Sequence, residues 1–548
     1  MKKILLATVL SLAPSVLLAQ SAVDAYQLSQ GDLKGTARFM SMGGAFGALG
    51  GDLSTLNQNP AGIGVYRSSE VGVTFDLNIQ ATKSNSDGFS LKEDQVKFYC
   101  PNFGYVGTFK LNNNVMPILN MGVSFSRTAS FDRIYRGGMP NIATSMSNYI
   151  ADFSNGYAPG ELDLTTDYNP YFDYNVNADW LSILAYNTYL INPIGNTSNY
   201  NGLYKYDANG NPITAGDAMF SVREQGYADE YSINLGGNFV DMVYWGVGLG
   251  ITDLEYTRYA YYDENLADAR VIELREVGNN DYEEYEVNGN ASFALDNYKH
   301  VSGTGYNFKA GLIVKPINEL RLGFAVHTPT YYDLRHDYKA ELDYQYLQEP
   351  EFSDYTEIAV FDSKLRTPWK IMASVAGVIG GRAIVSFDYE YDAYNDMVVK
   401  DDYGYTYDDV TTDINRYFKG QNIFRIGAEY RITPKFSVRA GYNYQMSNVK
   451  DAAANSSDYI ATSGTDPSYT FDNKTQYVTC GVGYRTGGFY IDAAYVYKNR
   501  ESRYHAFSRF DSGSDVFSYN LPPNEPMTPT ATIKDNNSSI VLSIGYKF

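Results

Sequence analysis

The chain has 548 residues, with 43 Lys and Arg against 63 Asp and Glu, which gives a formal net charge of −20. This acidity excludes a nucleic-acid binder, which needs a basic face. Four histidines and two cysteines leave little material for a metal or thiol enzyme. No run of 18 apolar residues follows the N-terminal region, so a bundle of membrane-spanning helices is excluded as well.

The N-terminus is expected to be a cleaved export signal. Lys2 and Lys3 precede an apolar stretch over residues 4–18, which ends before Ala19 and Gln20. A charged start, a short apolar stretch and a small residue at the cleavage point are typical of a secretory signal. A membrane anchor is disfavoured because the stretch is short and interrupted by polar residues. We therefore expect residues 1–20 to be removed and the mature protein to be exported.

The two cysteines are expected to be unpaired. Cys100 and Cys480 would reach an oxidising compartment, where a disulfide is possible. They lie far apart in the sequence, and two cysteines do not make a disulfide framework. Whether they interact stays open at this point.

Alternation of apolar and polar residues with period two is the dominant pattern. Phe424, Ile426 and Ala428 fall on one face of a strand, whereas Arg425 and Glu429 fall on the other. Segments of about 9–11 residues with this alternation are typical of transmembrane β-barrels. Fourteen such segments lie, in chain order, near 66–80, 95–110, 115–128, 228–239, 243–258, 301–315, 319–332, 366–379, 382–397, 421–432, 435–448, 474–486, 488–500 and 537–548.

The connections distinguish a barrel from a soluble sandwich. Six are tight, as at Gly380-Gly381 and Thr433-Pro434, seven are long, and tight and long alternate without exception. Bacterial outer-membrane barrels have short periplasmic turns, long extracellular loops and an even strand number. An open sheet in hydrocarbon would leave edge groups unpaired. The sequence therefore predicts an all-β fold, a 14-stranded antiparallel transmembrane β-barrel in the cell outer membrane of a Gram-negative bacterium.

The long connections carry most of the acidic residues. Two acidic stretches, 263–296 and 401–413, are expected to be loops. Solvated loop tips are the preferred interpretation, and divalent-cation binding is the alternative. The longest connection, 129–227, is expected to fold over the barrel mouth, with a short helix over 178–189.

Residues 21–65 precede the first strand and lack its alternation. Glycines concentrate over 43–51, where they allow the backbone to pack closely against a wall. Asp52 is expected to cap a helical turn that ends at Pro60. A phosphate-binding loop is disfavoured because no Gly-Lys-Ser/Thr follows. We therefore expect residues 21–65 to form a plug in the lumen and residues 66–548 to form the barrel.

Four motifs carry a family resemblance. Asn59-Pro60-Ala61-Gly62, after the glycine-rich segment, resembles the hatch of FadL-type outer-membrane transporters. Residues 322–329 resemble the family's Gly-x-x-Tyr-Arg-Ser-Pro strand, with Val326 and His327 in place of Tyr and Arg. Two further segments resemble hairpins of the same family. Residues 425–430 followed by 439–442 resemble its Gly-x-Glu-Tyr…Arg-x-Gly hairpin, and residues 481–484 followed by 489–495 resemble its penultimate hairpin.

The resemblance implies a function. Members of this family take up hydrophobic small molecules passively, typically long-chain fatty acids or aromatic hydrocarbons. Ligand enters from outside, binds beside the hatch and leaves sideways into the outer-membrane lipid, through a gap at a kink in the third strand. The resemblance implies that this chain is not an enzyme, and it favours long-chain fatty acids. Pro117 either marks the gap or starts the third strand, and both alternatives stay open.

The expected site residues fall into three groups. The hatch or gate comprises Gly43, Gly44, Asn59, Pro60, Ala61 and Gly62. Possible ligand contacts are Phe39, Phe46 and His327. A lumen polar network that holds the hatch comprises Asp388, Glu390, Arg425, Glu429, Arg439 and Asp492.

Two other functions are weighed against uptake. A lumen-facing His327 could ligate haem iron in a haemin receptor, but it has no partner histidine at an interpretable spacing, so a hydrogen-bonded lumen residue is preferred. A surface adhesin or structural barrel is the second alternative. A hydrolase is disfavoured because no Gly-x-Ser-x-Gly occurs and His505 has no identifiable serine partner. We expect no cofactor and no bound metal.

The C-terminus ends in Phe548, after Leu542, Ile544 and Tyr546 on the same parity. This pattern resembles the signal read by the barrel-assembly machinery. A monomer is expected because barrel closure needs no partner.

Overall fold

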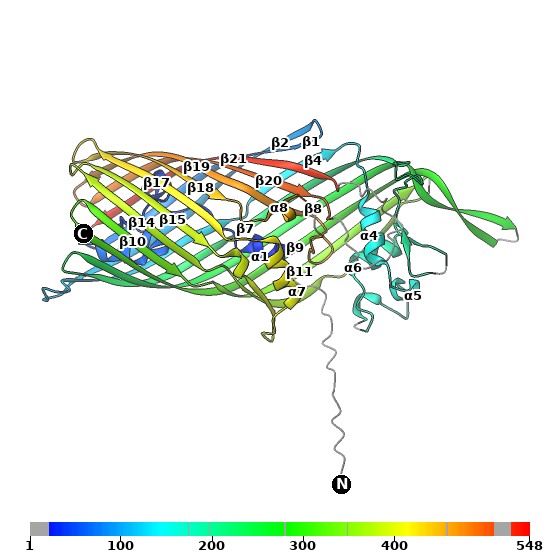
Figure 1. Ribbon diagram of the computed structural model, residues 1–548, viewed down its shortest axis with the longest axis horizontal. Coiled ribbons are helices and arrows are strands. Elements are labelled where there is room, and N and C mark those ends of the chain that lie inside the picture. Colours follow the sequence, from blue (N-terminus) through cyan, green and yellow to red (C-terminus); the bar gives the residue numbers. More distant parts are fainter. Residues whose placement is uncertain are drawn as a thin grey trace, which may run out of the picture.

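The computed structural model describes residues 21–548 apart from 174, 196, 279–280, 348, 456–458 and 509–527. The expected signal segment, residues 1–20, lies outside this range. The described chain is a long β-barrel with helices inside it and at one end (Figure 1).

The wall has fourteen antiparallel segments, as predicted. Each pairs with the next in chain order, and the last pairs with the first from Glu70↔Lys547 to Asn85↔Thr532, which closes the barrel. The strands are β1 (Glu70–Ser86), β2 (Phe89–Lys110), β3 (Ile118–Ser130) with its extension β4 (Arg133–Met139), β7 (Ala215–Phe239), β8 (Val243–Gly278), β9 (Asp281–Ile317), β10 (Leu320–His327) with β11 (Tyr331–Tyr346), β13 (Ala359–Arg366) with β14 (Lys370–Ile379), β15 (Ala383–Asp392) with β16 (Val398–Asp401), β17 (Gln421–Arg431), β18 (Phe436–Met446), β19 (Tyr469–Thr486), β20 (Phe489–His505) and β21 (Thr530–Lys547). A short strand, β12 (Phe352–Tyr355), adds to β11.

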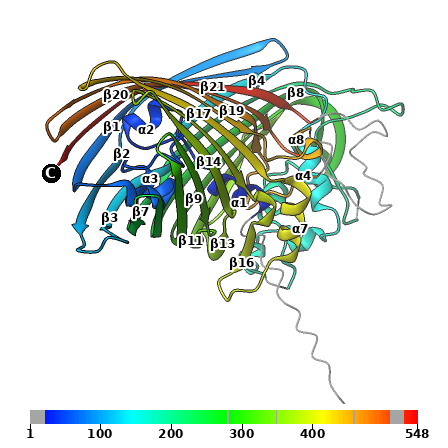
Figure 2. The same ribbon diagram turned by 60° about the vertical axis from the view of Figure 1, so that its left-hand side comes forward.

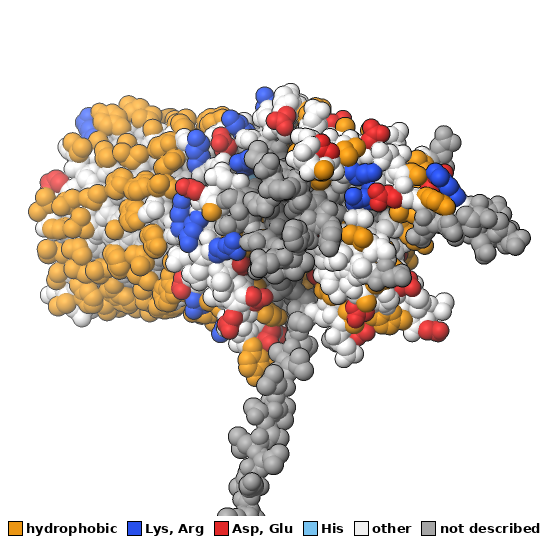
Figure 3. All heavy atoms as spheres, turned by 45° about the vertical axis from the view of Figure 1, so that its right-hand side comes forward, with side chains coloured by type: hydrophobic (Ala, Val, Ile, Leu, Met, Phe, Trp, Pro, Cys, Tyr) orange, Lys and Arg blue, Asp and Glu red, His pale blue; other side chains and the backbone are white. Residues whose placement is uncertain are grey.

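The exterior of the barrel carries an apolar belt. Along β17, Phe424 and Ile426 are exposed while Glu429 is buried in the lumen. Apolar side chains gather in a continuous band at one end of the molecule, with Lys and Arg along its edge (Figure 3). A band of this kind matches the lipid-facing surface of an outer-membrane barrel.

Within the described part of the chain, no helix is long and apolar enough to span a membrane.

The expectation that residues 263–296 form a loop was wrong. The described residues of this stretch belong to β8 and β9, which continue outward as a paired ribbon that projects from the barrel end (Figure 1). Val271 is buried on this ribbon although acidic residues surround it in the sequence. The charged residues thus masked the alternation that the strand pairing requires. Similarly, β1 and β2 continue through the expected first loop to a tight turn at Asp87 and Gly88.

The two ends of the stretch 129–227 belong to β3, β4 and β7, and the described residues between β4 and β7 fold over the outer end of the barrel, as expected (Figure 1). They contain α4 (Met146–Ser154), α5 (Pro159–Leu162), η2 (Pro170–Phe172), α6 (Trp180–Asn187), β5 (Asn192–Pro193) and β6 (Tyr200–Asn201). The helix predicted over 178–189 is α6. Ile183 and Leu184 pack with Leu295 and Leu342 of the extended strands, so the mouth has a hydrophobic core of its own. The later connections add η3 (Tyr394–Asp396), α7 (Asp408–Tyr417) and α8 (Asp451–Ala454).

Residues 21–65 lie inside the barrel (Figure 2) and are called the hatch below. They form α1 (Ala22–Leu28), α2 (Ala37–Ser41), α3 (Thr55–Gln58) and η1 (Pro60–Val65). Asp52 does not cap α3, because the N-cap is Ser54. Instead, Asp52 Oδ1 accepts hydrogen bonds from Thr36 Oγ1 and Ser54 N, and so ties two parts of the hatch together.

Candidate functional site: a path from the mouth to the barrel wall

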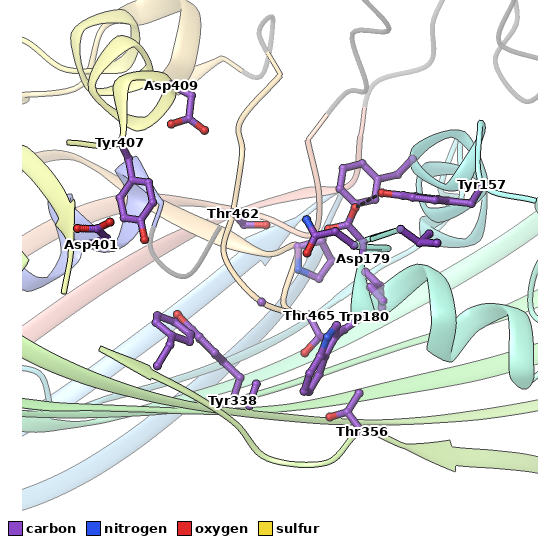
Figure 4. Close-up of a pocket in the computed structure, with 18 of the residues that line it drawn as sticks. Tyr157, Asp179, Trp180, Tyr338, Thr356, Asp401, Tyr407, Asp409, Thr462 and Thr465 are labelled. Atoms are coloured by element: carbon purple, nitrogen blue, oxygen red, sulfur yellow. Dashed lines mark hydrogen bonds between the residues drawn. The ribbon is translucent and has the colours of Figure 1, made fainter. Parts of the chain in front are cut away.

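A cavity of about 870 Å³ lies at the mouth of the barrel, between α6 and the segment around α7 (Figure 4). Ten aromatic side chains line it: Tyr149, Phe153, Tyr157, Trp180, Tyr338, Phe361, Tyr403, Tyr405, Tyr407 and Tyr459. Aromatic walls of this size suit a ligand with a large apolar surface.

The polar groups of this mouth cavity are acidic. Asp179, Asp401 and Asp409 line it, and its described lining contains no Lys or Arg. Desolvation by burial raises the pKa of Asp179 to about 6, against a weak opposing hydrogen bond from Tyr157. An uncharged ligand or a cation is therefore compatible with this lining.

Helix α1 lies beneath the mouth cavity. Tyr26 stacks on Phe418 with ring centroids 5.0 Å apart. Asp24 forms an ion pair with Lys299 and accepts a hydrogen bond from Ser463, which is adjacent to cavity-lining Gly464. The other end of α1, at Leu28, lines a second cavity. Helix α1 thus separates the two cavities.

The second, inner cavity has a volume of about 200 Å³ and lies beside the hatch. Phe39 and Gln58 line it from the hatch, and His327 lines it from the wall. His327 Nε2 lies 2.8 Å from the carbonyl oxygen of Gln58, so this ring is hydrogen-bonded. Phe46 is fully buried against Phe39 and does not line the cavity.

The expected polar network contacts the hatch directly. Arg439 donates to Glu429 at 2.6 Å and to Asp492 at 2.6 Å. Glu429 also accepts from Arg38 of the hatch at 3.0 Å, so one wall carboxylate bridges two arginines. All four side chains are largely buried. Removal of one partner would therefore leave an uncompensated charge inside the protein.

The remaining network members form a second group. Arg425 donates to Glu390 at 2.8 Å. Asp388 accepts the backbone N–H of Gly47 at 2.8 Å, a bond from the wall to the glycine-rich segment. The structure therefore brings all six predicted network residues to the wall around the hatch, in two groups.

Asn59 and Gly44 are held within the hatch. Asn59 Nδ2 donates to Gly47 O at 2.6 Å, and Asn59 Oδ1 accepts from Ala61 N at 3.1 Å. Gly44 O accepts from Gln58 Nε2 at 2.6 Å. Pro60 starts η1, where its missing N–H is not needed, and Gly62 N donates to Asn59 O. The geometry of this turn therefore depends mainly on Asn59.

Two glycine positions permit the close contact between hatch and wall. Gly43 has a φ of +64°, and a Cβ there would meet the backbone of Tyr442. On the wall, a Cβ at Gly311 would meet Asn59 Oδ1. Side chains at either position would push the hatch away from the wall.

A seam interrupts the wall between β2 and β3. Backbone pairing of these strands runs only from Asn102↔Ser126 to Lys110↔Ile118. Among the described strands, residues 89–99 of β2 pair on one edge only, with β1. Here β3 contains a bulge between Arg127 and Ala129. The third strand therefore leaves the ladder with β2 in the outer part of the belt, where Phe98 is 67% exposed, and its extension β4 passes close to β2 and β1 without pairing with them.

Side chains bridge the seam. Asp132 pairs with Lys97 at 3.3 Å and accepts from Tyr99 Oη at 2.7 Å. Inside the barrel, Thr128 O accepts the backbone N–H of Asp32 at 2.9 Å, so the hatch contacts the edge of the bent strand. Thr128 also lines the inner cavity. The hatch thus contacts the wall at a place where the backbone pairing between β2 and β3 has ended.

An apolar groove of about 700 Å³ lies on the lipid-facing wall beside the seam. The last backbone pair between β2 and β3 is Asn102↔Ser126, and the adjacent pair, Phe103 and Phe125, has side chains that line the groove. Side chains of β1, β7, β8, β20 and β21 line it as well. Its lining is almost entirely apolar, so it can hold a hydrocarbon chain next to the membrane.

Pro117 does not mark the seam. It precedes β3, and its carbonyl accepts the N–H of Leu111 at 2.8 Å, beside a continuous ladder. Of the two alternatives, Pro117 starts the strand. Cys100 and Cys480 are both free thiols. Phe548 is exposed at the end of the closing strand, where it exchanges two backbone hydrogen bonds with Ser69.

Sequence reasoning missed the mouth cavity and the seam. The tyrosines of the mouth come from connections far apart in the chain, so no local spacing joins them. At the seam, Arg127, Asp132 and Asp229 are ordinary charged residues in the sequence, and only the pairing of β3 with β7 in the fold places Arg127 opposite Asp229. The described residues contain no group of three or more His, Cys, Asp and Glu that could hold a metal ion.

No family model and no curated protein matches this chain. Among solved structures, a Pseudomonas aeruginosa FadL homologue is similar, with a TM-score of 0.48 and 13% identity over 94% of this chain and 99% of that chain. The toluene transporter TodX of Pseudomonas putida has a TM-score of 0.44 and 14% identity over 94% and 99%. The monoaromatic hydrocarbon channel CymD has a TM-score of 0.41 and 11% identity over 97% and 98%.

Proposed function

We propose that this protein is a passive outer-membrane channel for the uptake of hydrophobic small molecules, closed at rest by the hatch and releasing its ligand sideways. The observation that carries the proposal is the aromatic cavity of about 870 Å³ at the mouth of a barrel whose lumen the hatch fills. The motif resemblance points to the same function.

Entry is proposed to occur at the mouth cavity. A hydrophobic ligand gains about 0.8 kcal/mol per CH₂ group that it removes from water. The aromatic side chains supply that apolar surface outside the membrane belt. Tyr338 of β11 and Trp180 of α6 both line this cavity (Figure 4).

Passage then requires the hatch to move. Helix α1 separates the mouth cavity from the inner cavity, and the inner cavity alone, at about 200 Å³, is too small for a lipid. The bonds most directly involved are those of Asp24 to Lys299 and of Asp32 to Thr128. Their loss would join the two cavities and free the edge of β3.

Release is proposed to occur through the seam. Side chains rather than a backbone ladder hold β2 to the bend of β3, so this line opens at a lower cost than any fully paired line of the wall. The apolar groove beside Phe103 and Phe125 would receive the ligand on the lipid side. Within this class the resemblance favours long-chain fatty acids, whereas the acidic lining of the mouth cavity favours uncharged ligands and cations.

The haemin alternative gains no support from the site. His327 already shares a hydrogen bond with Gln58, in a cavity too small for a porphyrin. The proposed function includes no enzymatic step.

The test is to identify the small molecules that co-purify with the protein in detergent by mass spectrometry. We expect a lipophile in near-stoichiometric amount, reduced in Tyr157→Ala/Tyr407→Ala. The variant Tyr355→Ala, an exposed tyrosine outside the cavity, is the matched control and should retain the ligand. An empty barrel, or bound haem, would contradict the proposal.

A further inference from the structure

The mouth cavity has a charge pattern that a channel for fatty acids would not need. A fatty acid carries a carboxylate at neutral pH, yet three carboxylates and no basic side chain occur in the described lining of the cavity. Two of them, Asp401 and Asp409, lie on one side with Tyr407, and Asp179 lies on the other with Tyr157 and Trp180 (Figure 4).

Basic residues behind the cavity wall are already paired. Lys299 lies over the ring of Tyr338, 5.2 Å from the ring centroid, and pairs with Asp24. Arg258 pairs with Glu224 at 3.1 Å and with Asp466, which stands between cavity-lining Thr465 and Pro467, at 2.8 Å. Neither cation is available to neutralise the cavity carboxylates or a ligand carboxylate.

The cavity carboxylates themselves lack cationic partners among the described residues. Asp179 accepts only a weak hydrogen bond, at 3.4 Å from Tyr157 Oη. Asp401 accepts the backbone N–H of Tyr405 at 2.8 Å. Aromatic faces attract cations through the ring quadrupole, most strongly where water is excluded. Carboxylates beside aromatic walls therefore make two favourable contacts with the same organic cation.

We propose that the mouth cavity selects lipophilic cations, such as a quaternary ammonium attached to an apolar body, over carboxylates of the same size. The inference rests on the proposed function, since it names the substrate class of its entry site. The apolar body lies against the aromatic walls, and the ammonium lies between Asp179 and the pair Asp401 and Asp409. A fatty-acid carboxylate in the same place faces three like charges.

The experiment uses three probes of matched shape: 3-phenylpropyl-trimethylammonium, 4-phenylbutanoate and 4-phenylbutan-1-ol. Trp180 lines the cavity, and the other two tryptophans, Trp245 and Trp369, are replaced by Phe so that fluorescence reports on Trp180 alone. The full chain is titrated in detergent at pH 7.5 and low salt. We expect the ammonium to bind at least about tenfold more tightly than the carboxylate, with the alcohol between them, and salt to reduce the difference.

Two variants of equal net charge separate the cavity from the general acidity of the protein. Asp179→Asn/Asp401→Asn/Asp409→Asn should bring the three probes to similar affinities. Asp94→Asn/Asp333→Asn/Glu273→Gln removes three carboxylates away from the cavity and should keep the preference. In addition, burial raises the pKa of Asp179 to about 6, and among the described titratable groups the phenols of Tyr149, Tyr157 and Tyr459 interact with it. The preference should therefore decrease between pH 7.5 and pH 5.

Tighter or equal binding of the carboxylate would overturn the inference, as would a preference that survives in the cavity variant. If the alcohol still binds at Trp180 in that case, the entry site of the proposed function stands and only the charge selectivity fails. If no probe changes the fluorescence of Trp180, the inference and the entry site fail together.

Discussion

At the scale of single residues, Asn59 has the clearest role in holding the hatch. Its side chain joins Gly47 to Ala61, and it is almost fully buried against the wall. Removal of a buried amide leaves both backbone partners unsatisfied, at about 1–3 kcal/mol for each group. The sequence motif pointed to this residue, whereas its two partners are visible only in the fold.

Asn59→Ala is expected to loosen the hatch. Amide exchange over residues 44–62 should accelerate by roughly tenfold or more, because about 1.4 kcal/mol of local stability corresponds to one factor of ten. Asn57→Ala is the control, since the described structure gives the Asn57 side chain no hydrogen-bond partner. Equal exchange in the two variants would contradict the role of Asn59 in gating.

Glu264 predicts a pH dependence for the mouth. It is fully buried, accepts hydrogen bonds from Met146 N and Tyr262 Oη, and desolvation by burial raises its pKa from 4.5 to about 7. Between these two values the folded mouth holds a proton that the unfolded chain has released. Lowering the pH from 8 to 5.5 should therefore stabilise the mouth, by on the order of 2 kcal/mol from this group.

The measurement is the amide protection of α4, corrected for the intrinsic effect of pH, at pH 8 and pH 5.5. The increase should be clearly smaller in Glu264→Gln and kept in Glu273→Gln, an ion-paired residue on the projecting ribbon. The same increase in Glu264→Gln would show that another group is responsible.

At the scale of elements, the bend of β3 separates the seam from the rest of the wall. Amides of β2 over 89–101 that point toward the seam should exchange faster than those over 102–110, which the ladder with β3 protects. Asp132→Ala should increase the difference, because Lys97 and Tyr99 lose their shared partner. Asp94→Ala, which changes only a pair between exposed side chains on the same strand, is the control. Uniform protection along β2 would mean that the wall is closed there.

Strands were easier to predict than the seam for a physical reason. Lipid on one side and a packed lumen on the other impose period two on every strand, so all fourteen were found. Strand ends outside the membrane lack that constraint, so β8 and β9 were predicted too short. A bulge shifts the register by one residue and leaves no signal in the composition. The sequence therefore suggested Pro117 as a candidate for the gap and gave no indication of a bulge at Thr128.

At the scale of the whole molecule, the last strand closes the barrel. Phe548 exchanges backbone hydrogen bonds with Ser69, and its ring stacks near Tyr546 and Tyr105. Deletion of Phe548 should lower the amount of assembled barrel, measured by the shift in gel mobility on heating. Phe109→Ala, another exposed aromatic of the belt, should assemble normally. Normal assembly without Phe548 would contradict its role as an assembly signal.

The candidate site was predictable only in part. The hatch and its network came from motif residues that contact one another across the lumen. Arg38, which links the hatch to Glu429, had no such signal because it stands alone in the sequence. Residues from four connections line the mouth cavity. The sequence shows that these connections are rich in tyrosine and acidic residues, but it does not show that they enclose a cavity.

The central claim is that ligand leaves sideways through the seam under the control of the hatch. The most direct test measures the flux of a ligand through the protein while a reversible cross-link holds the seam closed. Lys97→Cys/Asp132→Cys, in a Cys100→Ser/Cys480→Ser background, is joined with a bis-maleimide that contains a cleavable disulfide. Entry of an uncharged lipophile into vesicles is then measured before and after reduction. The account predicts flux above that of empty vesicles in the open protein, a block by the linker and recovery on reduction. Flux that is absent from the open protein, or unchanged by the linker, would contradict it.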